Sequence, residues 1–387
     1  MARDPETDGW WDRYGHRLEL RHASPADPPM APADPAPGPA PTPAPTAAPR
    51  PPSAPFLMAP DGAAPLPELN EEAIVRPRDE LPTGGWRRAL LNATGGLVNP
   101  GPGEGELARR EVLHRVRRPL AGSHRIAVTS MKGGVGKTTV ATCLGLVLAE
   151  NRGDRAIVVD ANPDAGTLAD RLTGECAVTV RELLHDLDRI RSWADVSRYT
   201  SLAGRLQVLA SEQDPASGAA FHRDEYERVI GVLARYFDLV VTDSGTGLVH
   251  SAMEGTLALA DSVIVVGAPT VDGASRASKT LDWLTAHGHS ALASDAIVVL
   301  SCDRGSAEVD RERICEYFAA RCRAVVEVPQ DPHLATGGRV ELARLRRGTH
   351  DAFLELAALV ADRFGTGAPP GGAVPPVHAP ALGHAPA

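Results

Sequence analysis

The stretch Ser130-Met131-Lys132-Gly133-Gly134-Val135-Gly136-Lys137-Thr138-Thr139 decides the fold of this chain. Apolar residues 126–128 before it predict a strand, and residues 140–149 after it predict a helix. A glycine-rich turn between a strand and a helix directs backbone N–H groups and the positive end of the helix dipole at a phosphate. In such a turn Lys137 reaches the β- and γ-phosphates, and the Thr138 hydroxyl binds Mg²⁺. The residues expected to hold the nucleotide here are Lys132, Gly133, Gly134, Val135, Gly136, Lys137, Thr138 and Thr139.

Strands and helices alternate beyond this loop. The candidate strands are short, β-branched and apolar on both faces: Ala156–Asp160, Leu206–Leu209, Leu239–Asp243, Ser262–Gly267, Ala296–Leu300 and Ala324–Val328. The candidate helices between them are Val180–Arg191, Arg223–Tyr236, Gly273–His287, Val309–Ala320 and Thr349–Phe364. This alternation predicts an α/β fold with a doubly wound, mostly parallel sheet flanked by helices, and a ligand at the carboxyl ends of the strands.

Composition divides the chain into four parts. Half of its 34 prolines fall between Pro25 and Pro67, so residues 1–80 are expected to form a disordered Pro/Ala-rich tail. Residues 81–124 carry two short helical patterns and read as a linker or adaptor. Residues 125–364 suit one α/β domain with a substantial core, and residues 365–387 are Gly/Pro-rich and expected to be disordered.

Charge and cysteine content narrow the classes of protein. The net charge of −9 argues against a uniformly basic surface for nucleic acid, although a local patch remains open. Five cysteines without a Cys-x-x-Cys pair indicate reduced thiols in a cytoplasmic protein. No apolar run is long enough to cross a bilayer, and the acidic N-terminus does not resemble a secretory signal.

Two further predicted strands end in aspartate, at Asp160 and at Asp243. A carboxylate at the end of a buried strand costs desolvation free energy unless something pairs with it. Mg²⁺ with its waters is the natural partner in a nucleotide site. Thr138, Asp160 and Asp243 are therefore the expected metal-site residues.

The phosphate loop departs from the common pattern at its start. Met131 occupies the place of the first glycine, and a second lysine, Lys132, follows it. The run Lys-Gly-Gly-x-Gly-Lys-Thr resembles the deviant P-loop of the MinD/ParA ATPases. That resemblance implies that Lys132 crosses a dimer interface to the nucleotide of the partner subunit. It also likens Asp243 to the Walker B aspartate, and Asp160 to the first aspartate of the Walker A′ motif.

The chain differs from many of these relatives at Asn162. They carry Asp-x-Asp-Pro in the A′ motif, with the second aspartate orienting the attacking water, whereas this chain has Asp160-Ala161-Asn162-Pro163. An amide can hold a water but cannot take a proton. Phosphoryl transfer depends mostly on positioning and charge stabilisation, so we expect slow turnover that depends on a dimer or a partner. The expected catalytic residues are Lys132, Asp160 and Asn162.

The nucleotide base is assigned only by resemblance. The segment Val328-Pro329-Gln330-Asp331-Pro332 is similar to the one that flanks adenine in the family, so Pro329 and Asp331 are the expected base-pocket residues. ATP with Mg²⁺ is what the resemblance implies, and nothing in these residues separates ATP from GTP.

The flanking segments are similar to those of the EspI-type MinD-like ATPases, which are associated with type VII (ESX) secretion in mycobacteria and related bacteria. The shared features are the Pro/Ala-rich tail, the motif Gly-Trp-Arg-Arg…Thr-Gly-Gly…Asn-Pro-Gly at residues 85–101, and the A′ and Walker B segments. This resemblance implies a regulatory ATPase that forms an ATP-dependent homodimer and acts in secretion or in positioning an apparatus. A protein partner would bind the Pro-rich N-terminal tail.

Two other functions compete with this one. A partitioning ATPase would bind DNA nonspecifically through Arg339, Arg344, Arg346 and Arg347, which a solvated helix face explains better. A bacterial tyrosine kinase shares the P-loop but normally ends in a tyrosine cluster, and residues 365–387 contain no tyrosine. Because the sequence contains no long apolar run, we expect a cytoplasmic protein whose membrane contact is peripheral or runs through a partner.

Overall fold

The computed structural model describes residues 81–82, 84–162, 166–174, 178–212, 222–245, 251–302 and 308–365. They fall into two units, 81–106 and 107–365. The tails for which the sequence predicts disorder lie outside the described residues, apart from Gly365. Cys176 also lies outside them, and Cys143, Cys302 and Cys322 are free thiols.

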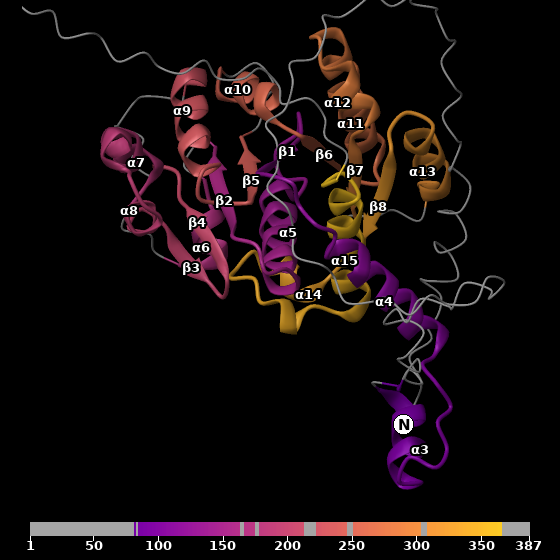
Figure 1. Cartoon of the computed structure of the whole chain (residues 1–387). Coiled ribbons are helices and arrows are strands. Elements are labelled where there is room, and N and C mark those ends of the chain that lie inside the picture. The colour runs from indigo at the N-terminus through magenta and orange to yellow at the C-terminus, as the bar shows by residue number, and fades with distance from the viewer. Residues whose placement is uncertain are drawn as a thin grey trace, which may run out of the picture. The chain divides into compact units, whose positions relative to one another are not determined.

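The larger unit is built on an eight-stranded sheet (Figure 1). Its strands are β1 His124–Thr129, β2 Ala156–Ala161, β3 Ser201–Ala203, β4 Leu206–Leu209, β5 Leu239–Ser244, β6 Ser262–Gly267, β7 Ile297–Ser301 and β8 Ala324–Val328. The spatial order is β3-β4-β2-β5-β1-β6-β7-β8, and every neighbouring pair is parallel except β3 with β4. The predicted doubly wound, mostly parallel sheet is confirmed.

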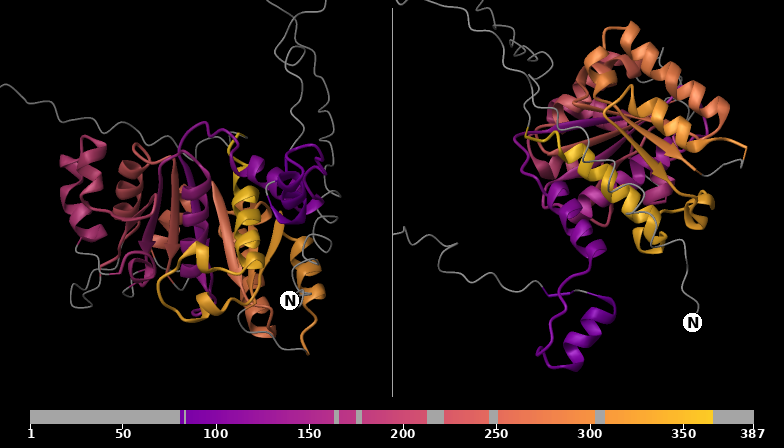
Figure 2. Two further views of the ribbon diagram at one scale, coloured as in Figure 1. Left: turned by 90° about the horizontal axis from the view of Figure 1, so that it is seen from below. Right: turned by 90° about the vertical axis from the view of Figure 1, so that its right-hand side faces the viewer.

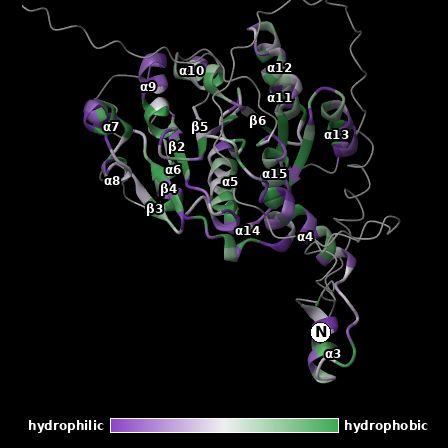
Figure 3. Cartoon of the chain, viewed as in Figure 1, coloured by the Kyte–Doolittle hydropathy of each residue, from purple (hydrophilic) through white to green (hydrophobic). Residues whose placement is uncertain are grey.

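Helices cover both faces of this sheet (Figure 2). They are α4 Glu104–Val116, α5 Lys137–Asn151, α6 Leu168–Leu172, α7 Val180–Asp186, α8 Trp193–Ser197, α9 Arg223–Leu233, α10 Ser251–Leu259, α11 Val271–Ala286, α12 Ser290–Ser294, α13 Arg311–Ala319, α14 Pro332–Ala335 and α15 Arg347–Ala361. Helix α5 packs on the central strands, and α15 packs on α5 and β8. Apolar residues of α7, α9 and α10 cover the opposite face of β2 and β5, and those of α11 and α13 cover β6 and β7. Hydrophobic residues concentrate in the strands accordingly (Figure 3).

The strand β3 and the ends of several helices differ from the expectations. β3 has three residues, too few for a periodic pattern, and it pairs antiparallel with β4 across a turn in which Gly204 has φ of 63°. The helix expected at Val180–Arg191 ends at Asp186 and continues as a 3₁₀ turn, Leu187–Arg189. The short helices α6, α8, α10, α12 and α14 were not expected, because four to nine residues carry too little helical periodicity to detect.

The smaller unit contains one short helix, α3 Gly85–Ala93, within the helical pattern expected there. Gly95 and Gly96 follow it with φ of 60° and 90°, and the N–H of Gly96 donates to the Leu91 carbonyl at 2.9 Å, which is a glycine helix stop. The Arg87 guanidinium donates to the Pro100 carbonyl at 2.8 Å, so the chain after the helix folds back along it.

Helix α4, which the sequence places in the linker 81–124, packs on the C-terminal helix. Arg109 pairs with Asp351, and Arg115 pairs with Glu355 at 3.0 Å and with Asp362 at 2.6 Å. Asp351 and Glu355 are 5% and 6% exposed, so these arginines neutralise carboxylates that burial would otherwise penalise. The arginines of this helix thus hold it against α15, as expected of a helix packed on the α/β domain.

We predict that Arg115→Ala lowers the free energy of unfolding by about 3–5 kcal/mol, because it leaves the Glu355 carboxylate buried without its partner. Arg118→Ala is the matched control. Arg118 pairs with the same Asp362 at 2.8 Å but is 46% exposed, so its loss costs about 1 kcal/mol or less. Urea unfolding of the two variants checks this, and equal losses would contradict it.

Candidate functional site

The phosphate loop joins β1 to α5 as the sequence predicts. Gly134 and Gly136 adopt φ of 70° and 96°, a region that favours glycine, and these two residues turn the chain into the helix. The Ser130 hydroxyl accepts the Lys132 N–H at 3.1 Å and shapes the start of the loop. Gly133 and Gly134 are exposed, so the backbone of the loop centre is accessible to a ligand.

Lys137 lies at the first position of α5 and is only 8% exposed. Burial lowers its pKa, and the nearby charge of Asp243 opposes that shift. A buried ammonium facing a carboxylate is suited to the negative charge of a phosphate group. Thr138 follows it, and its hydroxyl bonds the Asp243 side chain.

Asp160 and Asp243 are direct register partners on the adjacent parallel strands β2 and β5. They are 1% and 2% exposed. Burial raises the pKa of Asp160 to about 6, and burial together with the Asp160 charge raises the pKa of Asp243 to about 7. The structure therefore brings the three predicted metal-site residues, Thr138, Asp160 and Asp243, to one edge of the sheet.

These residues fit Mg²⁺. Among the described residues, the buried Asp243 Oδ1 atom has no hydrogen-bond partner. An orphaned carboxylate oxygen beside a hydroxyl and a second carboxylate gives the oxygen-only donor set that Mg²⁺ prefers. When bound, the metal would neutralise the two carboxylates and the phosphates.

Lys132 is paired with a residue outside this cluster. Its ammonium pairs with Asp272, near the start of α11, at 2.6 Å, and the two side chains are 38% and 59% exposed. The ion pair lowers the pKa of Asp272. The Lys132 ammonium is thus held by a carboxylate that is not part of the phosphate loop. Because both side chains are accessible to water, this ion pair can be broken readily.

Asn162 and the base-pocket residues occupy different surroundings. The N–H of Asn162 donates to Asp160 Oδ1 at 3.1 Å, which places Asn162 beside the metal-site carboxylate. Asp331 is 3% exposed, and its two oxygens accept the N–H groups of His333 at 2.9 Å and Arg346 at 2.8 Å. Its carboxylate caps α14 and ties the segment before α15. Contact of Pro329 and Asp331 with a base remains a prediction.

Two nearby residues were missed by the sequence analysis. Ser211, beyond β4, bonds both the Asp160 carboxylate and the Gly166 N–H. Ser301 ends β7, and its hydroxyl lies 3.5 Å from where a Cβ on Gly136 would stand. Both sit at the carboxyl ends of parallel strands, and that position is the signal that could have found them.

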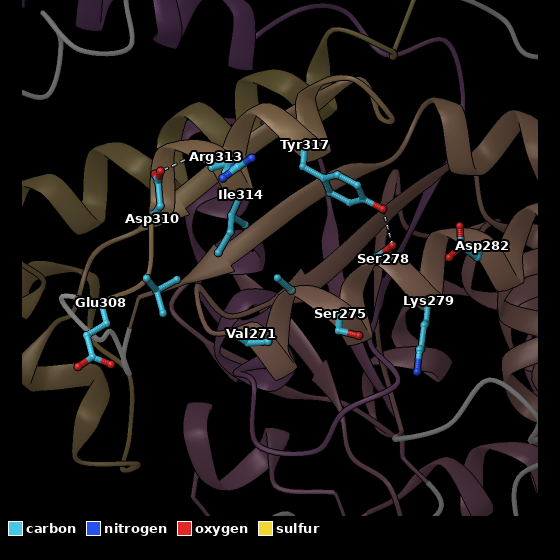
Figure 4. Close-up of a pocket in the computed structure, with 12 residues that line it drawn as sticks. Val271, Ser275, Ser278, Lys279, Asp282, Glu308, Asp310, Arg313, Ile314 and Tyr317 are labelled. Atoms are coloured by element: carbon cyan, nitrogen blue, oxygen red, sulfur yellow. Dashed lines mark hydrogen bonds between the residues drawn. The ribbon is translucent and has the colours of Figure 1, made fainter.

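A groove of about 590 Å³ lies between α11 and α13 (Figure 4). Val271, Ile314 and Tyr317 line it, and a hydrogen bond of 2.8 Å joins the hydroxyls of Ser278 and Tyr317. It contains no phosphate-loop residue. Its lining begins at Val271, next to the Asp272 that holds Lys132.

Comparison with known proteins identifies the family. A model of the CobQ/CobB/MinD/ParA nucleotide binding domain matches residues 126–335, more than half of the chain. The chain belongs to this family. The sequence-based resemblance to MinD and ParA proteins is thereby confirmed.

Individual MinD/ParA-type proteins are similar to different extents. The ESX-1 secretion-associated protein EspI of Mycobacterium tuberculosis is 34% identical over 284 residues, which cover 72% of this chain and 42% of EspI. The chain therefore matches less than half the length of that relative. A ParA family ATPase from Chlorobium tepidum TLS has a TM-score of 0.53 at 16% identity, covering 61% of this chain and 98% of the other. The septum site-determining protein MinD complexed with Mg-ADP, from Pyrococcus horikoshii OT3, has a TM-score of 0.50 at 22% identity, covering 61% and 94%.

We predict that Asp243→Asn stabilises the protein at pH 8 in buffer free of nucleotide and metal, by on the order of 2 kcal/mol. The pKa of Asp243 is raised in the folded state, so between about pH 4 and pH 7 the folded state keeps a proton that the unfolded state releases. The wild-type free energy of unfolding therefore falls as pH rises through this window, and the neutral asparagine removes the part of the fall that Asp243 contributes, while the buried Asp160 keeps its own.

Chemical unfolding of both proteins at pH 4.5 and pH 8 measures this difference. The two should nearly coincide at the lower pH, where the aspartate is protonated in the folded protein. A mutant less stable than wild type at pH 8 would contradict the electrostatic account of the site.

Proposed function

We propose that this protein is an ATP-binding regulatory ATPase that alternates between a monomer and a nucleotide-sandwich dimer. The observation that carries the proposal is the division of labour between the two lysines of the loop. Lys137 is buried beside Asp243, whereas the side chain of Lys132 is 38% exposed and is held by Asp272. A lysine turned away from its own loop is available to the phosphates of a second copy.

The chemistry follows from the residues around the loop. The backbone N–H groups of Gly133 to Gly136 and the α5 dipole bind the phosphates, and Lys137 adds a positive charge near the transferred group. Thr138, Asp160 and Asp243 would hold Mg²⁺, which would supply positive charge beside the phosphates. Asn162 positions the attacking water through its amide without accepting the proton, so turnover is slow.

The cellular role proposed here is the regulation of type VII secretion or the positioning of an apparatus. It is supported by the similarity to EspI, an ESX-1 secretion-associated protein. The Pro-rich residues 25–67 would bind the partner. The part of the chain that the structure describes contains no helix long and apolar enough to cross a membrane.

Nonspecific DNA binding is the second candidate, and the C-terminal arginines give it less support. Arg347 lies 3.6 Å from Asp351 and Arg344 lies 4.0 Å from Glu341, so acidic neighbours offset these charges. The Arg346 N–H is bound to Asp331. DNA binding that requires ATP and is lost on Arg346→Glu with Arg347→Glu would favour this alternative.

We predict that ATP or a non-hydrolysable analogue converts the protein to a dimer, that ADP does not, and that Lys132→Ala stays monomeric. Size-exclusion chromatography with light scattering measures the mass directly. Lys279→Ala is the matched control, since it removes an exposed lysine from α11 and should still dimerise. Monomers of wild type under every condition would refute the sandwich dimer.

We predict that Asp272→Asn lowers the ATP concentration needed for dimerisation about twofold to fivefold, because it frees Lys132 from an exposed ion pair of modest strength. Asp282→Asn on the same helix is the control, since Asp282 pairs with Arg321 instead. An Asp272→Asn variant that needs more ATP than wild type would show that the pair does not restrain Lys132.

We predict that Asn162→Asp raises kcat for ATP hydrolysis by about tenfold or more, because a carboxylate at this position can accept a proton from the attacking water. Asn162→Ala should lower kcat below that of the wild type while leaving nucleotide affinity nearly unchanged. Steady-state phosphate release measures both variants. Equal rates for all three proteins would remove Asn162 from the catalytic residues.

A further inference from the structure

Ser211 joins two points of the loop that follows β2. It lies two residues beyond the end of β4 and is 3% exposed. Its hydroxyl accepts the N–H of Gly166 at 3.0 Å and bonds the carboxylate of Asp160. One buried side chain therefore contacts both Asp160, near the end of β2, and the backbone of Gly166.

The Asp160 carboxylate also accepts hydrogen bonds from two backbone N–H groups that follow it in the chain. Its Oδ1 accepts the N–H of Asn162 at 3.1 Å, and its Oδ2 accepts the N–H of Leu168, the first residue of α6, at 3.2 Å. Three hydrogen-bonding groups thus surround one carboxylate, and they come from the loop, from α6 and from the end of β4.

Glycine is required at position 166 because this carboxylate leaves no room for a side chain, and not because of its backbone angle. A Cβ added at Gly166 would stand 2.0 Å from Asp160 Oδ2, a distance that no real contact allows. The backbone can approach the carboxylate this closely only because residue 166 has no side chain.

The end of β4 is itself fixed from its other side. The N–H of Val180, at the start of α7, donates to the Ala210 carbonyl at 2.8 Å, and the Thr179 hydroxyl lies 3.5 Å from a Glu212 oxygen. Ser211 therefore lies between two residues that are hydrogen-bonded to the start of α7. These bonds fix its position where it contacts Asp160 and Gly166.

We propose that Ser211 is a positioning residue: together with Gly166 it holds the Asp160 carboxylate in one geometry against the backbone at Gly166 and at the start of α6 before nucleotide and Mg²⁺ bind. This set of contacts among Ser211, Gly166 and the Asp160 carboxylate, called the clamp below, is a property of the nucleotide-free chain. Its consequence for the metal rests on the proposed function, because Asp160 is then presented to Mg²⁺ without reorganisation.

Hydrogen exchange of the nucleotide-free protein tests the clamp without any activity. In Ser211→Ala the Gly166 amide loses its acceptor, so a peptide covering residues 161–168 should exchange about tenfold faster than in wild type. Ser211→Thr keeps the hydroxyl and should restore slow exchange. Gly166→Ala disrupts the same contacts by placing a Cβ against the Asp160 carboxylate, and it should also speed exchange. It replaces Ser211→Ala in this test if that variant does not fold.

Ser262→Ala is the matched control. Ser262 is 2% exposed at the start of β6, and its hydroxyl bonds His124 Nε2 at 2.9 Å, so its loss also removes one buried hydrogen bond. Exchange of residues 161–168 should not change in this variant. Unchanged exchange in Ser211→Ala, or equal acceleration in Ser262→Ala, would overturn the proposal.

The Mg²⁺ requirement tests the positioning role. The Mg²⁺ concentration that half-saturates binding of a fluorescent ATP analogue should rise about threefold to tenfold in Ser211→Ala and recover in Ser211→Thr. An unchanged requirement despite faster exchange would reduce Ser211 to a structural residue. If no variant, wild type included, binds the analogue while exchange responds as expected, the clamp stands and the proposed ATPase function fails.

Discussion

Asp160 and Asp243 face each other because β2 and β5 run parallel in register, so two carboxylates meet in the interior where water cannot solvate them. The arrangement raises both pKa values and leaves Asp243 Oδ1 without a hydrogen bond among the described residues. A fold selected for stability alone would place apolar side chains at these positions. The surrounding structure offsets part of the cost through Lys137, Thr138 and Ser211, and a bound cation would offset the rest.

The rest of the site is arranged around this pair by the order of the strands. β1 lies between β5 and β6, so the phosphate loop emerges next to Asp243, and α5 directs Lys137 at it. On the other side β6 leads into α11, whose Asp272 holds Lys132. Neighbouring strand ends thus place Lys137 at the carboxylates and Lys132 at Asp272, and the proposed switch between monomer and dimer rests on this difference.

The sequence predicts most of this edge because the residues that make it stand at the ends of short, continuously apolar strands. The loop from Ser130 to Thr139, Asp160 and Asp243 could be read from local pattern alone. Ser211 could not, because a serine in a polar loop has no pattern of its own, and its role appears only when β4 is placed beside β2. The contact of Lys132 with Asp272 and that of Arg115 with Glu355 join residues far apart in the chain, so no local signal exists for either.

Isothermal titration calorimetry of ATP into the wild-type protein, with and without Mg²⁺, tests the central claim most directly. We predict binding of one ATP per chain that weakens at least tenfold without Mg²⁺, is lost in Lys137→Ala and persists in Lys132→Ala. Absence of binding, or binding indifferent to both Mg²⁺ and Lys137, would contradict the assignment of this strand edge as a magnesium–nucleotide site.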